Sequence, residues 1–314
     1  MSEQDTSPGV DRRASGAYVL APAALVWMAA MLWSARATIV GRTDAEMAVT
    51  STAYALPGAV SASLVAGAAV ALAVLGVITR RRATGATTRF LIASGTGVCV
   101  GLLGALPIIT INSEGWVYAV VGGTVAAAAT IGGTLAGFRL PHVVRAVCWA
   151  AIGVFGVGFV LNLFQTPVLS ALGSGGSQSS QAGAAQWFAF CQSVVSGLAA
   201  GLIAYRVLRR LRRSGSADAA WPFYALAGAG PGLLLVIAEG LTRTAGARVL
   251  ELAGKVSELE LTVQHLLSAA RLNNALIILF AGATTAVIAV GRTLGTARTD
   301  EQADAAEPAT ATAD

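Results

Sequence analysis

Polar side chains that end apolar stretches are the residues of this chain with the clearest chemical potential. They follow four of these stretches, and they are Arg36, Asn112, Asn162, Gln165 and Glu239. Together they offer one cation, one carboxylate and three amides, which recognise a solute through charge and hydrogen bonds. None is a nucleophile beside a base, so the pattern indicates binding and not covalent catalysis. We expect these residues to ring a polar cavity that opens at the outer face of a membrane.

Arg36 and Glu239 are the ionisable residues closest to the interior of the apolar stretches. A charged side chain that faces lipid is costly, so each should face other helices or reach the lipid headgroups. Two arrangements satisfy this requirement. The two residues pair and close the outer end of the cavity, or each extends on its own toward the membrane surface.

Residues suited to catalysis or metal binding are sparse. Asp44 and Glu46 lie in one polar loop, where they would serve an enzyme at the outer leaflet as base and metal ligand, or would be plain surface charges. His142 and His265 fall on opposite sides of the membrane, the three cysteines lie in three different stretches, and no phosphate-binding glycine loop occurs. We therefore predict no catalytic residue, no metal site and no cofactor.

The elements that must position these residues are apolar stretches of about 20 residues, the length a helix needs to cross the hydrocarbon core. We expect spans at 17–37, 56–78, 90–112, 116–138, 143–165, 187–208, 221–240 and 272–291. The pattern predicts an all-α, polytopic membrane helix bundle of about eight transmembrane helices. The bundle should occupy residues 16–292, with residues 1–15 and 293–314 disordered.

Arginine clusters set the expected orientation of the bundle. They lie at 80–82, 139–145, 209–213 and 292–298, after every second stretch. Basic loops stay on the cytoplasmic side, so the pattern predicts a multi-pass protein of the bacterial inner membrane with cytoplasmic N- and C-termini. The first stretch also resembles a secretory signal, but its apolar run is longer than a usual signal core, so we expect a retained span.

Composition supports the membrane interpretation. Of the 314 residues, 55% are hydrophobic and 12% are charged, and the mean hydropathy is +0.68. These values lie outside the range of soluble globular proteins. The net charge of +5 does not require a nucleic-acid partner, because the basic residues gather on one predicted side. The predicted partner is the lipid bilayer.

The segment 247–271 differs from the spans, because its apolar residues recur at alternating intervals of three and four. This spacing is the seam of an amphipathic helix that packs against another helix. We expect a separate exoplasmic helix that covers the outer mouth of the bundle, or that pairs with a membrane-protein partner or a second copy in a homo-oligomer. The seam residues are Leu252, Val256, Leu259, Val263 and Leu266.

Glycines four residues apart recur in three of the expected spans. Such pairs let helix backbones approach closely, and they would also fit the lining of a narrow pore. The pairs are Gly97/Gly101, Gly133/Gly137 and Gly197/Gly201.

Three functional classes fit the sequence. The leading hypothesis is a permease or channel-like component for a small or amphipathic solute, with no energy source of its own. It leads because polar residues end several spans and Pro107 and Pro231 interrupt helices nearby. The alternative is a structural or assembly scaffold of a membrane complex. An outer-leaflet enzyme comes third, because acid and base groups are missing from the middle of the spans.

Overall fold

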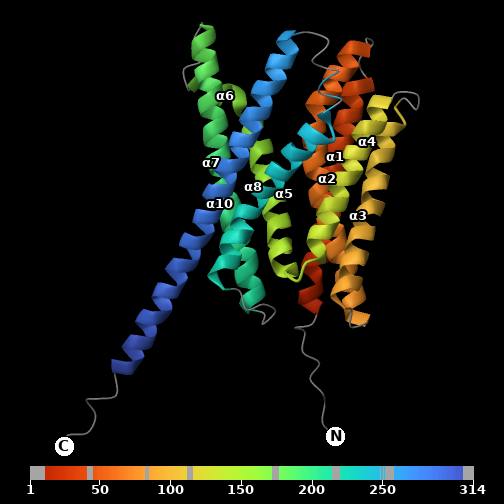
Figure 1. Cartoon of the computed structure of the whole chain (residues 1–314). Helices are drawn as coiled ribbons and strands as arrows, with labels where there is room; N and C mark the ends of the chain where they lie inside the picture. Colours follow the sequence, from red (N-terminus) through yellow and green to blue (C-terminus); the bar gives the residue numbers. More distant parts are fainter. Residues whose placement is uncertain are drawn as a thin grey trace, which may run out of the picture.

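The fold is an all-α bundle of long helices (Figure 1). The computed structural model describes residues 11–40, 45–81, 85–111, 116–171, 177–213, 220–247, 249, 251 and 258–306. Within these ranges no strand occurs. The helices are α1 (Asp11–Val40), α2 (Ala45–Arg81), α3 (Ala86–Ile109), α4 (Trp116–Gly137), α5 (Pro141–Leu163), α6 (Gln165–Ala171), α7 (Gln178–Arg213), α8 (Trp221–Thr244) and α10 (Glu258–Ala306).

Eight of these helices are long and apolar enough to cross a membrane, and each overlaps one of the eight ranges expected from the sequence. The polytopic helix bundle is therefore confirmed. Several helices extend beyond the predicted ranges, most clearly in the spans Ser179–Arg213 and Leu261–Arg292. The hydrocarbon core limits only the apolar run, whereas the backbone continues its helical hydrogen bonds into the polar flanks.

Successive membrane helices run in opposite directions, so α1 begins and α10 ends at the same end of the bundle (Figure 1). We call this the arginine end, because α2 finishes there at Arg81 and α7 at Arg213. The other end, where α8 finishes beyond Glu239, is the glutamate end.

Helices α1–α4 form a first group that is held together by close backbone contacts. A methyl group added to Gly97 would lie 2.7 Å from the carbonyl oxygen of Ala129, and one added to Gly133 would lie 2.6 Å from that of Ala93. Glycine at these positions lets α3 and α4 touch along their backbones. The packing interpretation of these glycines is thereby supported, and no pore needs to pass between the two helices.

Helices α5, α7, α8 and α10 form a second group with the same kind of contact. Gly201 lies against the backbone of Gly282, and a methyl group on Gly232 would lie 2.6 Å from the carbonyl oxygen of Ala275. The two groups meet where α2 packs against α5 and α8.

Helix α10 corrects the expectation of a separate exoplasmic helix at 247–271. It runs without interruption from Glu258 to Ala306, so residues 258–271 belong to the same helix as the eighth span. The physical reason is continuity of the backbone, because no proline or glycine lies between Glu258 and Gly282 to break the hydrogen-bond ladder.

The predicted seam is covered only in part. Leu259 and Leu266 are exposed and Val263 is half-buried, while Leu252 and Val256 lie outside the described residues. Helical structure also enters both segments expected to be disordered, because α1 begins at Asp11 and α10 continues to Ala306.

Candidate functional site

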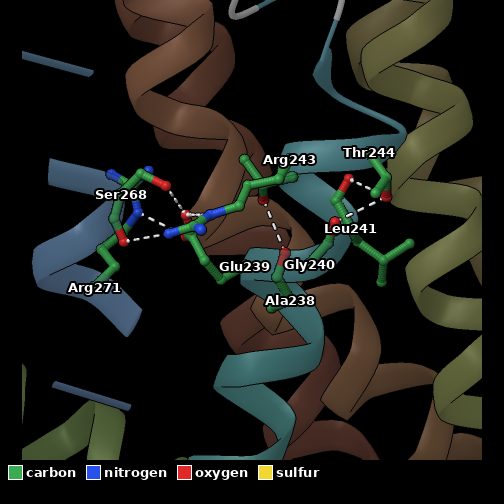
Figure 2. A network of polar contacts seen from close by, with 9 residues as sticks. Ala238, Glu239, Gly240, Leu241, Arg243, Thr244, Ser268 and Arg271 are labelled. Atoms are coloured by element: carbon green, nitrogen blue, oxygen red, sulfur yellow. Dashed lines mark hydrogen bonds and ion pairs between the residues drawn. The ribbon is translucent and has the colours of Figure 1, made fainter. Parts of the chain in front are cut away.

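A buried carboxylate lies at the centre of the polar network at the glutamate end (Figure 2). The side chain of Glu239 on α8 is 4% exposed. The Nε atom of Arg243 donates to its Oε1 at 3.1 Å, and the Nε atom of Arg271 donates to its Oε2 at 2.9 Å. The hydroxyl of Ser268 also donates to Oε1. This carboxylate therefore accepts hydrogen bonds from three side chains, two of them cationic.

Helix spacing brings these four residues together. Glu239 and Arg243 are four positions apart on α8, and Ser268 and Arg271 are three apart on α10, so each pair shares one helix face. The contact of Gly232 with Ala275, described above, lets α8 and α10 approach each other closely. A further hydrogen bond, from Nη2 of Arg243 to the carbonyl oxygen of Ser268 at 3.0 Å, closes the network.

A pocket of about 590 Å³ adjoins this network. Arg243 and Ser268 belong to both, and the pocket wall also contains Gln264, His265 and Glu251. These side chains supply hydrogen-bond donors, hydrogen-bond acceptors and charges of both signs. The pocket is therefore suited to a polar or charged group of a solute at the membrane surface.

Arg36 does not pair with Glu239, so the pairing hypothesis is wrong. Its Nη1 atom donates to the carbonyl oxygen of Pro107 and, at 3.0 Å, to the hydroxyl of Thr110. The last carbonyl groups of a helix have no partner within that helix, and a cation there also favours the helix dipole. Arg36 therefore caps the C-terminal end of α3, while Glu239 finds its cations on α8 and α10.

The remaining members of the predicted ring are not brought into contact with this pair. Asn162 lies exposed near the end of α5, and Gln165 begins the short helix α6, also exposed. Asn112 lies outside the described residues. The polar ring around an outer cavity therefore stays a prediction. Among its members with described positions, only Glu239 lies in a buried ionic network.

Sequence reasoning missed Ser268 and Arg271 as partners of Glu239. The positions of the predicted span ends could have indicated them. Antiparallel neighbouring spans place the end of one at the level of the start of the next. Glu239 ends the predicted span 221–240, and Ser268 and Arg271 directly precede the predicted span 272–291.

Two apolar cavities, both partly open to the surface, lie where the two helix groups meet. The first has a volume of about 120 Å³, and its wall includes Trp27, Phe155 and Pro231. The rings of Trp27 and Phe155 stack with their centroids 4.8 Å apart, and the indole nitrogen of Trp27 has no hydrogen-bond partner. The second cavity has about 180 Å³ and is lined by residues such as Cys148 and Gly230.

Candidate metal ligands do not gather in the described ranges. No group of three or more His, Cys, Asp or Glu residues lies there within reach of one metal ion. The side chains of Asp44 and Glu46 lie outside the described part of the chain. His142 begins α5 at the arginine end, whereas His265 lies at the glutamate end, so the two histidines do not share a site.

Comparison with known proteins gives no further assignment: no family model, no curated protein and no solved structure matches this chain.

Proposed function

We propose that this polytopic membrane protein is a permease for a small amphipathic solute, without an energy source of its own. The observation that carries the proposal is a pair of apolar cavities between the two helix groups. Their volumes are about 120 and 180 Å³, and both are lined mainly by apolar side chains. Apolar concave surfaces between the helices of a bundle are common ligand sites, so these two cavities favour occupation by a ligand.

The size and lining of the cavities indicate the apolar part of the solute. An apolar cavity of about 150 Å³ lined by aliphatic and aromatic side chains accepts a benzene ring. Trp27, Phe155 and Leu234 provide such a lining in the first cavity. A small apolar molecule crosses a bilayer unaided, so a permease is needed only where a charged or polar group is attached to that ring. The pocket beside Arg243 supplies partners for such a group.

Pro231 in α8 supports movement between the two groups. A proline has no N–H to donate to the carbonyl four residues earlier, which weakens the helix at that position. Pro231 lies in the wall of the first cavity, in a helix that contacts both groups. Rocking of two helix bodies about a central site is how many transporters expose the site to each side in turn.

A flux experiment tests this proposal. The purified chain is placed in liposomes, and uptake is measured for 4-toluenesulfonate, a permanent anion, and benzyltrimethylammonium, a permanent cation. Both combine a benzene-sized body with a charge that slows leakage through lipid. We expect uptake of one of them above that of empty liposomes. Uptake of neither would contradict the proposal.

Matched variants of α5 link the flux to the cavity. Val154 lines the first cavity, whereas Val160 on the same helix is 50% exposed at the surface. Val154→Phe should fill the cavity and lower the uptake at least about tenfold, because the benzene ring of the solute cannot enter a filled cavity. Val160→Phe should leave the uptake unchanged. Equal effects of the two substitutions would mean that the solute does not pass through this cavity.

A scaffold is the second candidate, and the exposed apolar surface of α10 at the glutamate end favours it. Leu266 is 66% exposed on the part of α10 that precedes the predicted core of the eighth span. If this surface holds a partner or a second copy, Leu266→Asp should release it during purification, because the new charge would lie in an apolar contact. His265→Asp, at the neighbouring exposed position, is the control and should retain the complex.

A further inference from the structure

A groove at the arginine end, between α5 and α7, carries an unusual concentration of positive charge. Its volume is about 370 Å³, and its wall contains Arg145, Arg206 and Arg210 together with Trp149. The aliphatic side chains of Ile203 and Val207 complete the wall toward the apolar part of the bundle. No carboxylate contributes to this lining.

Helical spacing explains why these residues share one groove. On α7, Arg206 and Arg210 are four positions apart and therefore lie on one face. On α5, Arg145 and Trp149 are also four positions apart, and α5 packs directly against α7. Two arginines of α7 and one of α5 thus meet across one helix contact.

The positive charge in the groove has no counterpart in the described part of the chain. Arg145, Arg206 and Arg210 form no ion pair there, and the Nε atom of Arg145 is buried without a hydrogen-bond partner. A like-charged pair four positions apart, such as Arg206 and Arg210, opposes helix formation. An anion placed between the arginines would relieve this repulsion and satisfy the buried donor.

The surroundings identify the kind of anion. Guanidinium groups bind phosphate oxygens with two parallel hydrogen bonds, and a basic groove between membrane helices is a common site for anionic headgroups. Tryptophan is typical of the depth where headgroups meet the hydrocarbon core. Ile203 and Val207 give the acyl chains an apolar surface directly beside the arginines.

We propose that this groove binds an anionic phospholipid, with its phosphate between Arg145, Arg206 and Arg210 and its acyl chains along α7. The proposal does not depend on the transport of a solute. It predicts a specific lipid at one position of the bundle, and not a general attraction of the arginine end to negatively charged membranes.

Native mass spectrometry of the detergent-solubilised chain tests the proposal. The probes are dioleoyl phosphatidylglycerol, which is anionic, and dioleoyl phosphatidylcholine, which has the same chains and no net charge. The test variant is Arg206→Gln with Arg210→Gln, both at exposed positions. The control is Arg212→Gln with Arg213→Gln, which removes the same charge from exposed positions at the end of α7.

We expect the unaltered chain to prefer phosphatidylglycerol, and the test variant to bind it at least about tenfold more weakly, because two charge-assisted contacts are lost. The control variant should bind it within about twofold of the unaltered chain, since its arginines lie outside the groove. Equal weakening in both variants, or equal binding of the two lipids, would overturn the proposal.

A competition arm distinguishes a lipid from free phosphate, which shares the same recognition chemistry. Inorganic phosphate is added in large excess to the complex with phosphatidylglycerol. We expect the lipid to remain bound, because its chains add contacts along α7 that phosphate lacks. Displacement of the lipid by phosphate alone would assign the groove to a soluble anion and would overturn the lipid proposal.

Discussion

The Nε atom of Arg271 on α10 lies 2.9 Å from the Oε2 atom of Glu239 on α8, so an ion pair joins two helices that are separated by a connecting segment. Ser268 and Arg243 bond the other oxygen of the same carboxylate. Because the carboxylate is almost fully buried, its charge depends on all three donors. This network fastens the glutamate end of the second helix group.

Removal of the carboxylate charge should weaken the contact between α8 and α10 and lower the stability of the fold. Glu239→Gln leaves two arginines beside a neutral amide, and we expect a loss of about 1–3 kcal/mol of stability. The value lies below that of a fully buried ion pair because both arginines are partly exposed to solvent. The measurement is thermal and denaturant-induced unfolding of the purified chain in detergent. Unchanged unfolding would mean that the ion pairs contribute nothing to the fold.

Arg36 and Glu239 should behave as independent sites. Each has its own partners, so the effects of Arg36→Gln and Glu239→Gln on stability should add within about 0.5 kcal/mol in a double-mutant cycle. Arg271→Gln combined with Glu239→Gln is the positive control, and it should show clear coupling through the direct contact. Coupling between Arg36 and Glu239 as strong as in the control would restore the pairing hypothesis that the structure rejects.

The glycine contacts can be tested on α4 with one matched pair. A methyl group on Gly132 would lie 2.8 Å from the backbone carbonyl carbon of Leu64 in α2, whereas nothing lies within 4 Å of the same group on Gly123. Gly132→Ala should therefore destabilise the bundle by about 1–3 kcal/mol through overpacking. Gly123→Ala should be neutral or slightly stabilising, because alanine favours the helix more than glycine does. Similar unfolding temperatures for both variants would contradict backbone contact between α2 and α4.

The orientation of the bundle in the membrane is open to a labelling test. We expect the arginine end to face the cytoplasm, because basic segments are retained there. In a chain whose own cysteines are replaced by alanine, a cysteine at His265 should react with a membrane-impermeant maleimide in intact cells. A cysteine at Arg212 should react only after the membrane is opened. The reverse pattern of reactivity would invert the predicted topology.

The number and order of the membrane helices could be predicted from the sequence because each depends on a local property. About 20 apolar residues in a row are enough to specify a span, and every one of the predicted ranges overlaps a helix of the structure. The backbone contacts of Gly97 and Gly133 were also indicated by spacing alone. These features require no knowledge of which helices are neighbours.

The partners of the ionisable residues could not be predicted, because they depend on the arrangement of helices in space. Arg36 and Glu239 both end spans on the same side, and the sequence does not show that one meets α3 while the other meets α10. The extent of α10 was misjudged for a different reason. A change from an amphipathic pattern to a uniformly apolar one looked like a boundary, but side-chain pattern alone does not end a helix.

The unbroken course of α10 makes it longer than one membrane crossing requires. Its 49 residues extend about 74 Å at 1.5 Å per residue, more than twice the thickness of the hydrocarbon core. Gly282 lies at the midpoint between Glu258 and Ala306, and it is the residue whose backbone meets Gly228 of α8. A rod that pivots about its centre moves its two ends equally and in opposite directions. If α10 tilted about this contact, loss of the Arg271–Glu239 ion pair on one side of Gly282 would therefore move the arm of α10 on the other side of Gly282 in the opposite direction.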